Sequence, residues 1–435
     1  MASHQRLVES LRSLLSWIVQ RWQLAPVLIA LLLSLAAEGP PPASLDTRAN
    51  RILAGERFDF AGWEVRALLG KLSHSLIAPQ HYMDEPARHD FFLDYLELVA
   101  DIQRFEREIH RIYTDSEVKN PEAATAELRA HVIELRAEEE ARQPLAEAIL
   151  EEQTACILVD EGFGILGQEF PPVGAHFTPL PLLLVVSPRD HIERIFSLGL
   201  RHGLDVARRE AIEGEIDTSL DVSSLVTGIG GMAAYPAMLL ESSSLNWLAE
   251  VTAHEWTHHY LAPRPLGWNY DAIPEARTIN ETVASIVGKE AGRRMVARYY
   301  PELLPPEPES TPEQPQDKTP PPEPPAFDFR AEMRETRIQA DELLAQGKIE
   351  EAEAYMEERR QEFVAHGYYM RKLNQAYFAF HGAYADKPGA AGADPTGPAV
   401  RELHARSLNL YTFVVWASHV TTLAELETLL EEIEE

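Results

Sequence analysis

The sequence contains little cysteine and few basic residues for its length. Cys156 is the only cysteine among 435 residues, which excludes an intrachain disulfide and a cysteine-rich metal site. We expect Cys156 to be a small buried hydrophobic residue. The chain carries 39 basic against 69 acidic side chains, a formal net charge of −30. Because phosphate binding requires clustered Lys and Arg, this balance argues against nucleic acid as a partner, and we attribute the acidity to solubility.

One apolar run stands out near the N-terminus and suggests export. Arg6, Arg12 and Arg21 precede residues 24–37, which are largely apolar. We interpret residues 1–37 as a signal-anchor or a cleaved signal peptide, with a tilted span over 14–37 as the anchored form. Both interpretations place the rest of the chain outside the cytoplasm, either attached to the membrane by this segment or secreted. The alternative is an N-terminal helix buried in the fold.

The remaining chain reads as a mostly helical α+β protein. From Phe92 to Ile112 the apolar residues step by threes and fours, which predicts a long amphipathic helix that pairs with a second one through Leu135. Residues 180–186 predict a buried strand. We expect a linker at 38–50, a helical hairpin region at 51–160, a core at 161–300, a disordered proline-rich insertion at 301–326 and a C-terminal helical region at 327–435.

The segment from His254 to His258 is the most informative part of the chain. It reads His-Glu-Trp-Thr-His, and two histidines four residues apart lie on one helix face, where both imidazoles can bind one metal ion. Glu255 would point toward a water molecule on that metal. We predict a helix from about Leu245 to Tyr260, with serine N-cap hydroxyls before it. His259 is rotated away from His258 and is expected to lie outside the ligand set.

A second predicted helix, from about Glu275, supplies the third ligand. Glu281 follows His258 after 22 intervening residues, and a glutamate on a rigid helix is held more accurately than one on a loop. Asp271 and Glu275 are the competing candidates, because either could reach the metal if the loop folded back. Three protein ligands leave one position open for water, as a catalytic site requires.

These motifs resemble the gluzincin metallopeptidases, the class of thermolysin and the zinc aminopeptidases. The resemblance covers about 60 residues and rests on His-Glu-x-x-His followed by the Asn-Glu pair at 280–281. It implies a zincin-like core in which one Zn²⁺ ion is bound by His254, His258 and Glu281. Glu255 would be the general base in hydrolysing a peptide or protein substrate. It further implies that an edge strand binds the substrate backbone through Gly230, Gly231, Met232 and Ala233.

The resemblance leaves two roles to be assigned, the residue that orients a histidine ligand and the donor to the oxyanion. Some relatives place an acidic residue one turn after the glutamate ligand, where it orients a histidine, but Ser285 stands there in this chain. A hydroxyl or a backbone carbonyl would then have to hold the imidazole. Such enzymes also add a Tyr or His donor for the oxyanion, and Tyr377, His381 and Tyr384 are the candidates, with Tyr384 our choice. The alternative, which the pattern of this segment favours, is a helix whose aromatic residues only pack.

Residues 225–238 predict the edge strand itself, since three glycines and a proline interrupt an apolar pattern. Such a strand could pair with an extended peptide or could simply be an edge protected against aggregation. For the whole protein we predict a zinc peptidase. The competing hypothesis is a non-catalytic envelope protein that uses a zincin-like scaffold for interactions.

Overall fold

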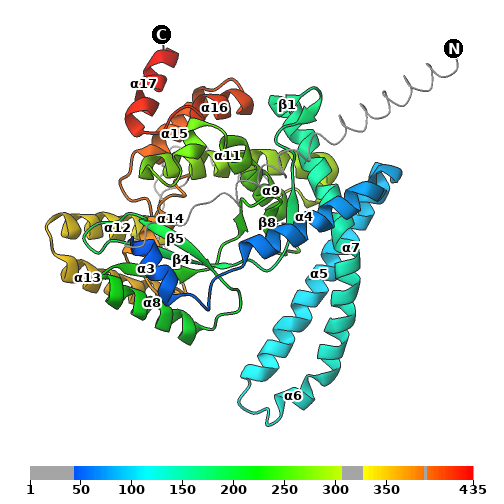
Figure 1. Cartoon of the computed structure of the whole chain (residues 1–435), viewed down its shortest axis with the longest axis horizontal. Coiled ribbons are helices and arrows are strands. Elements are labelled where there is room, and N and C mark those ends of the chain that lie inside the picture. Colours follow the sequence, from blue (N-terminus) through cyan, green and yellow to red (C-terminus); the bar gives the residue numbers. More distant parts are fainter. Residues whose placement is uncertain (1–43, 306–326, 387–388, 435) are drawn as a thin grey trace, which may run out of the picture.

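The computed structural model describes residues 44–305, 327–386 and 389–434. Within these ranges the protein is mostly helical with small sheets, in agreement with the predicted α+β class (Figure 1). The α-helices are α3 Leu45–Ile52, α4 Phe60–Ile77, α5 Glu85–Thr114, α6 Pro121–Ala124, α7 Ala126–Leu158, α8 Val206–Leu220, α9 Leu245–Leu261, α10 Pro265–Trp268, α11 Pro274–Tyr299, α12 Phe329–Ala345, α13 Ile349–Ala365, α14 Gln375–His381, α15 Thr396–Arg406, α16 Leu410–Ala417 and α17 Leu423–Glu434. Short irregular helices are η1 Pro79–Tyr82, η2 Val159–Phe163 and η3 Pro301–Leu303.

The strands form three small sheets. They are β1 Gly164–Ile165, β2 Gln168–Glu169, β3 Ala175–Phe177, β4 Leu182–Ser187, β5 Phe196–Leu200, β6 Ser223–Thr227, β7 Gly231–Met232 and β8 Ala237–Leu239. β1 pairs with β2, β4 lies between β5 and β6 in an antiparallel sheet, and β8 lies between β3 and β7. Along β4, Leu184 and Val186 pack with α3 and α8, whereas Leu183 and Val185 face α14. This alternation is the period of a strand covered on both faces.

The predicted helical hairpin is confirmed by α5 and α7, which lie side by side and project from the body of the molecule (Figure 1). α6 closes the far end of the hairpin. Near its base, Arg136 on α7 forms ion pairs with Glu106 on α5 at 2.8 Å and with Glu241 after β8 at 2.6 Å. The hairpin is therefore tied to the segment that leads into α9.

The main hydrophobic core lies around α9 and α11. Both helices pack directly on each other, and α5, α7, β3, β8 and α15 to α17 complete the same cluster of buried side chains. Trp256 is 1% exposed and donates a hydrogen bond from Nε1 to the carbonyl of Pro171 at 2.7 Å. These contacts fix α9 in the centre of the protein, where its polar residues face a cavity.

The expectation of a membrane anchor needs correction. None of the helices in the described ranges is both long and apolar enough to cross a membrane. The longest, α5 and α7, carry charged side chains along their length. Membrane attachment through the N-terminal apolar segment, and a localisation anchored at the membrane, are therefore not supported. Secretion after signal cleavage stays a prediction. Residues 1–37, on which that prediction rested, lie outside the described residues.

Three local expectations also change. Residues 45–50, predicted as linker, belong to helix α3, and Cys156 is exposed, not buried. The single edge strand predicted over 225–238 is divided, because β6 pairs with β4 in one sheet while β7 pairs with β8 in another. The buried strand predicted at 180–186 is confirmed as β4. Residues 306–326 of the proline-rich segment lie outside the described residues.

Candidate metal centre

Helix α9 carries both histidines of the motif. Its N-cap is Ser244, whose hydroxyl accepts a hydrogen bond from the amide of Trp247 at 3.4 Å and so satisfies one free N–H of the first turn. The helix is buried on most sides, which explains why its apolar residues show no single stripe. His254 and His258 lie one turn apart and are partly exposed, while Glu255 between them is buried.

Helix α11 brings the glutamate to the histidines. Asn280 and Glu281 are buried in its N-terminal third, on the side that faces α9. The two helices approach closely because of a glycine one turn beyond Ala284. A Cβ atom added to Gly288 would lie 2.7 Å from the carbonyl oxygen of Glu250 and 3.1 Å from the Cβ of His254. No other residue type fits at this position without moving one of the helices.

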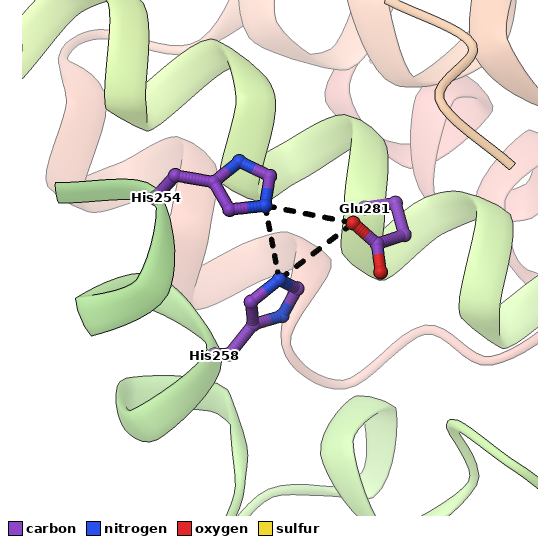
Figure 2. A group of neighbouring side chains, drawn as sticks. All are labelled: His254, His258 and Glu281. Atoms are coloured by element: carbon purple, nitrogen blue, oxygen red, sulfur yellow. Dashed lines mark hydrogen bonds and ion pairs between the residues drawn. The ribbon is translucent and has the colours of Figure 1, made fainter. Parts of the chain in front are cut away.

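The three side chains converge on one point (Figure 2). The two Nε2 atoms of His254 and His258 are 3.1 Å apart. The Oε2 atom of Glu281 lies 3.5 Å from the first and 3.6 Å from the second. Oε2 is buried and has no hydrogen-bond partner. Because an unpartnered buried carboxylate oxygen is costly, and because all three atoms point inward, the group could hold a metal ion.

The other atoms of these side chains are held by neighbours. Nδ1 of His258 lies 2.7 Å from Oδ1 of Asn280, and an amide oxygen that accepts from Nδ1–H leaves the lone pair of Nε2 facing Glu281. Oε1 of Glu281 accepts a hydrogen bond from the hydroxyl of Tyr270. The residue that orients His258 is thus a side-chain amide, not the hydroxyl or backbone carbonyl that we expected.

The pKa values of Glu281 and Glu255 are shifted in opposite directions from the ordinary value of a glutamate. Burial alone would raise the pKa of Glu281, but the charges of His258 and His254 and the Tyr270 hydrogen bond bring it down to about 2. Glu255 lacks such partners, and burial raises its pKa to about 7 despite the attraction of His254. One carboxylate is therefore ionised throughout the neutral range, whereas the other can exchange a proton near neutral pH.

The cluster opens onto a cavity of about 620 Å³. Of the four residues predicted to bind substrate, Gly231, Met232 and Ala233 line this cavity, while Gly230 uses its carbonyl to accept a hydrogen bond from the amide of Leu240 at 3.1 Å. A Cβ atom on Gly231 would lie 2.2 Å from Oε1 of Glu255. The glycine therefore lets the β7 backbone approach the carboxylate directly.

Tyr384 is the one residue of the three oxyanion candidates that lines this cavity. Its ring stacks on His254 with 6.4 Å between centroids. Tyr377 and His381 lie against each other, 4.3 Å between ring centroids, on the wall of a separate cavity. The structure thus brings Tyr384 to the cluster and leaves the other two outside it.

The competing ligands lie away from the cluster. Asp271 and Glu275 are exposed, and neither belongs to the group of converging atoms. His259 points elsewhere, with Nε2 2.7 Å from the carbonyl oxygen of Ala234. Burial lowers the pKa of His259 to about 4, so it is a neutral residue that holds the segment after β7.

Sequence reasoning missed the side of the cavity that lies beyond Glu281. Tyr270, Arg194 and Arg277 line this part. The guanidinium carbons of Arg194 and Arg277 lie 5.2 Å and 5.6 Å from the centroid of the Tyr270 ring. Arg277 could have been noticed, because it lies one turn before Glu281 on the same helix. Arg194 comes from the loop between β4 and β5, and no spacing in the sequence connects it with the motif.

Comparisons of this chain with protein-family models, with curated proteins and with solved structures gave no match. Its function therefore has to be inferred from the site itself. That site consists of two histidines and a glutamate that converge beside a buried carboxyl group, in the wall of a cavity bounded by the edge strand β7.

Proposed function

We propose that this protein is a zinc-dependent peptidase with a zincin-like core. The observation that carries the proposal is the convergence of His254 Nε2, His258 Nε2 and Glu281 Oε2 beside Glu255. Two imidazoles and a carboxylate form a ligand set typical of catalytic zinc. In a tetrahedral zinc site with bonds of about 2.0–2.1 Å, ligand atoms are about 3.3–3.4 Å apart. The separations of 3.1, 3.5 and 3.6 Å are close to this value.

Glu255 is the proposed general base. Zinc, when bound, would polarise the substrate carbonyl and make a water molecule acidic enough to react at neutral pH. Glu255 would accept a proton from the attacking water and deliver it to the departing amine. Burial raises the pKa of the Glu255 carboxyl, whereas the positive charge of a bound zinc ion would lower it, so that the group would be ionised and ready to accept the proton.

Tyr384 is the proposed oxyanion donor. Although Tyr384 is 37% exposed as a whole residue, the atoms packed around its hydroxyl exclude water and raise its pKa above the ordinary value, and the nearby charge of Glu281 adds to the effect. The hydroxyl therefore keeps its proton at neutral pH and can donate a hydrogen bond to the oxygen on which negative charge develops. Its ring stacks on His254, so the hydroxyl is carried on the same wall of the cavity as the ligands.

The edge strand supports a peptide as the substrate. β7 pairs with β8 on one side and lies at the edge of its sheet, and its two residues line the cavity next to Glu255. An extended chain bound along this edge would bring a backbone carbonyl toward the carboxyl group of Glu255. Apolar side chains, among them Phe60, Trp63 and Phe380, complete the wall and suit uncharged side chains of the substrate.

The experiment measures zinc content and peptide cleavage of the purified full chain with a mixed peptide library. Glu255→Gln keeps the shape of the side chain but removes the base, so we expect cleavage to fall by about 10²-fold or more with stoichiometric zinc retained. Glu275→Gln is the matched control, because Glu275 lies on the exposed start of α11. Protein without stoichiometric zinc, or equal cleavage by wild type and Glu255→Gln, would refute the proposal.

A further inference from the structure

Two arginines are buried side by side in the cavity wall. The side chains of Arg194 and Arg277 are 8% and 6% exposed. Both line the cavity that contains the metal ligands, and both guanidinium groups lie near the Tyr270 ring. A buried charge is normally paired and hydrogen-bonded, because leaving water costs it several kcal/mol.

The acidic groups around Arg194 and Arg277 do not balance the two positive charges. Asp271 is the carboxylate that both arginines share: it accepts a hydrogen bond from Arg194 at 2.8 Å, but its nearest oxygen is 3.7 Å from Arg277. Its side chain is 86% exposed, so solvent weakens both attractions. Among the described residues Arg277 has no hydrogen-bond acceptor for its guanidinium, and its Nε atom is buried without a partner.

Tyr270 contacts both the arginine pair and the candidate metal centre. Its ring contacts both guanidinium groups, while its hydroxyl donates to Glu281 Oε1. A single phenol ring therefore separates the two positive charges from a metal ligand.

We propose that Arg194 and Arg277 form a subsite for a carboxylate of the peptide substrate, in the part of the cavity that lies beyond Glu281. The inference rests on the proposed peptidase activity for the ligand being a peptide. A planar guanidinium binds a carboxylate through two parallel hydrogen bonds, and an anion there would compensate the second positive charge. The carboxylate belongs either to an acidic side chain or to the C-terminus of the substrate.

The charge of the whole protein strengthens this assignment. A chain with a net charge of −30 repels acidic peptides at a distance. A cationic pair inside the cavity attracts an anionic group locally, whereas Phe60 and Trp63 make other parts of the wall apolar. The cavity thus has one position for a carboxylate and another for uncharged side chains.

The test measures binding, so that it does not depend on cleavage. Calorimetric titration of the full chain, prepared without metal and again with zinc and the Glu255→Gln substitution, would use blocked alanine peptides. In the first pair, both peptides end in an amide, and one contains an internal Glu where the other contains Gln. In the second pair, neither peptide contains Glu or Gln, and one ends in a free carboxylate where the other ends in an amide. We expect at least one acidic peptide to bind about tenfold more tightly than its neutral counterpart, as for a hydrogen bond to a charged group.

Variants then assign the preference to the two arginines. Arg277→Met and Arg194→Met should each abolish the preference and leave the affinity for neutral peptides unchanged, whereas Arg277→Lys should restore part of it. Arg111→Met is the control, since Arg111 is exposed on α5 and pairs with Glu108. A preference for the internal Glu identifies a side-chain subsite, and one for the free terminus identifies a C-terminal subsite.

The inference and the proposed function fail in different ways. Equal binding of acidic and neutral peptides, or an equal loss of affinity for both in Arg277→Met, would overturn the carboxylate subsite even if the protein cleaves peptides. Selective binding that depends on Arg277, found in a protein that cleaves nothing, would keep the subsite and overturn the proposed hydrolysis.

Discussion

Replacing Gly288 by alanine should force apart the two helices that carry the candidate metal ligands. The new Cβ atom would lie 2.7 Å from the carbonyl oxygen of Glu250, where ordinary contact begins at 3.4 Å. The helices would have to separate by roughly 0.7 Å, and overpacking of this kind costs about 1–3 kcal/mol. The better helix propensity of alanine returns up to about 1 kcal/mol. We therefore expect a net loss of about 0–2 kcal/mol in the free energy of unfolding.

Gly214 offers a matched control on helix α8. An added Cβ atom there meets nothing within 4 Å, so Gly214→Ala should gain about 0.5–1 kcal/mol from helix propensity alone. Urea unfolding of both variants measures the difference. Because His254 lies 3.1 Å from the added atom, Gly288→Ala should also weaken zinc binding by about tenfold, the lower end of the effect of disturbing the surroundings of a ligand. Equal stability and equal zinc affinity in the two variants would refute this account of the helix contact.

Three further predictions concern single side chains. Asn280→Leu removes the acceptor that orients His258 and should weaken zinc binding by about 10–100-fold, measured by competition with a chelator; unchanged affinity would contradict the orienting role. Burial lowers the pKa of His381 from 6.5 to about 4, so the unfolded chain binds a proton that the folded protein does not, and the fold loses stability progressively as the pH falls from 6.5 to 4. When the pH is lowered from 7 to 5, the free energy of unfolding of the wild type should fall by up to about 2 kcal/mol more than that of His381→Phe, as measured by urea unfolding. An identical pH dependence of the two proteins would count against the buried neutral imidazole. Tyr384→Phe should lower kcat by about 10²-fold with little change in KM, whereas Tyr377→Phe, outside the cavity, should leave both constants unaltered; similar effects of the two variants would exclude Tyr384 as the oxyanion donor.

The long helices could be predicted because their signal is local. The spacing of apolar residues along α5 and α7 and the serine N-cap of α9 are properties of neighbouring positions. The structure confirms all three helices, α9 within one residue, although α5 begins seven residues before Phe92 and α7 continues well beyond Leu135. The division of residues 225–238 could not be predicted in this way. β6 and β7 differ in which strand each one pairs with, and that choice depends on residues far away in the sequence.

The same distinction applies to the candidate site. The i, i+4 spacing is enough to predict that His254 and His258 share a helix face, and the following helix made Glu281 the natural third member. Asn280 was visible as part of the motif, but its contact with Nδ1 of His258 depends on how α11 is rotated against α9. Arg194 could not be predicted as part of the site from the sequence, because only the fold brings its loop beside Tyr270.

All three candidate ligands come from just two helices, α9 and α11, which are packed against each other in the centre of the protein. A metal ion held there would act as a cross-link between two halves of the core, and its binding energy would count as folding energy. At a free metal concentration about 1,000 times the Kd, the folded state gains about 4 kcal/mol. The stability of the folded chain would then rise with the logarithm of the free zinc concentration, and starvation for zinc would shorten the lifetime of the protein as well as stop the proposed catalysis.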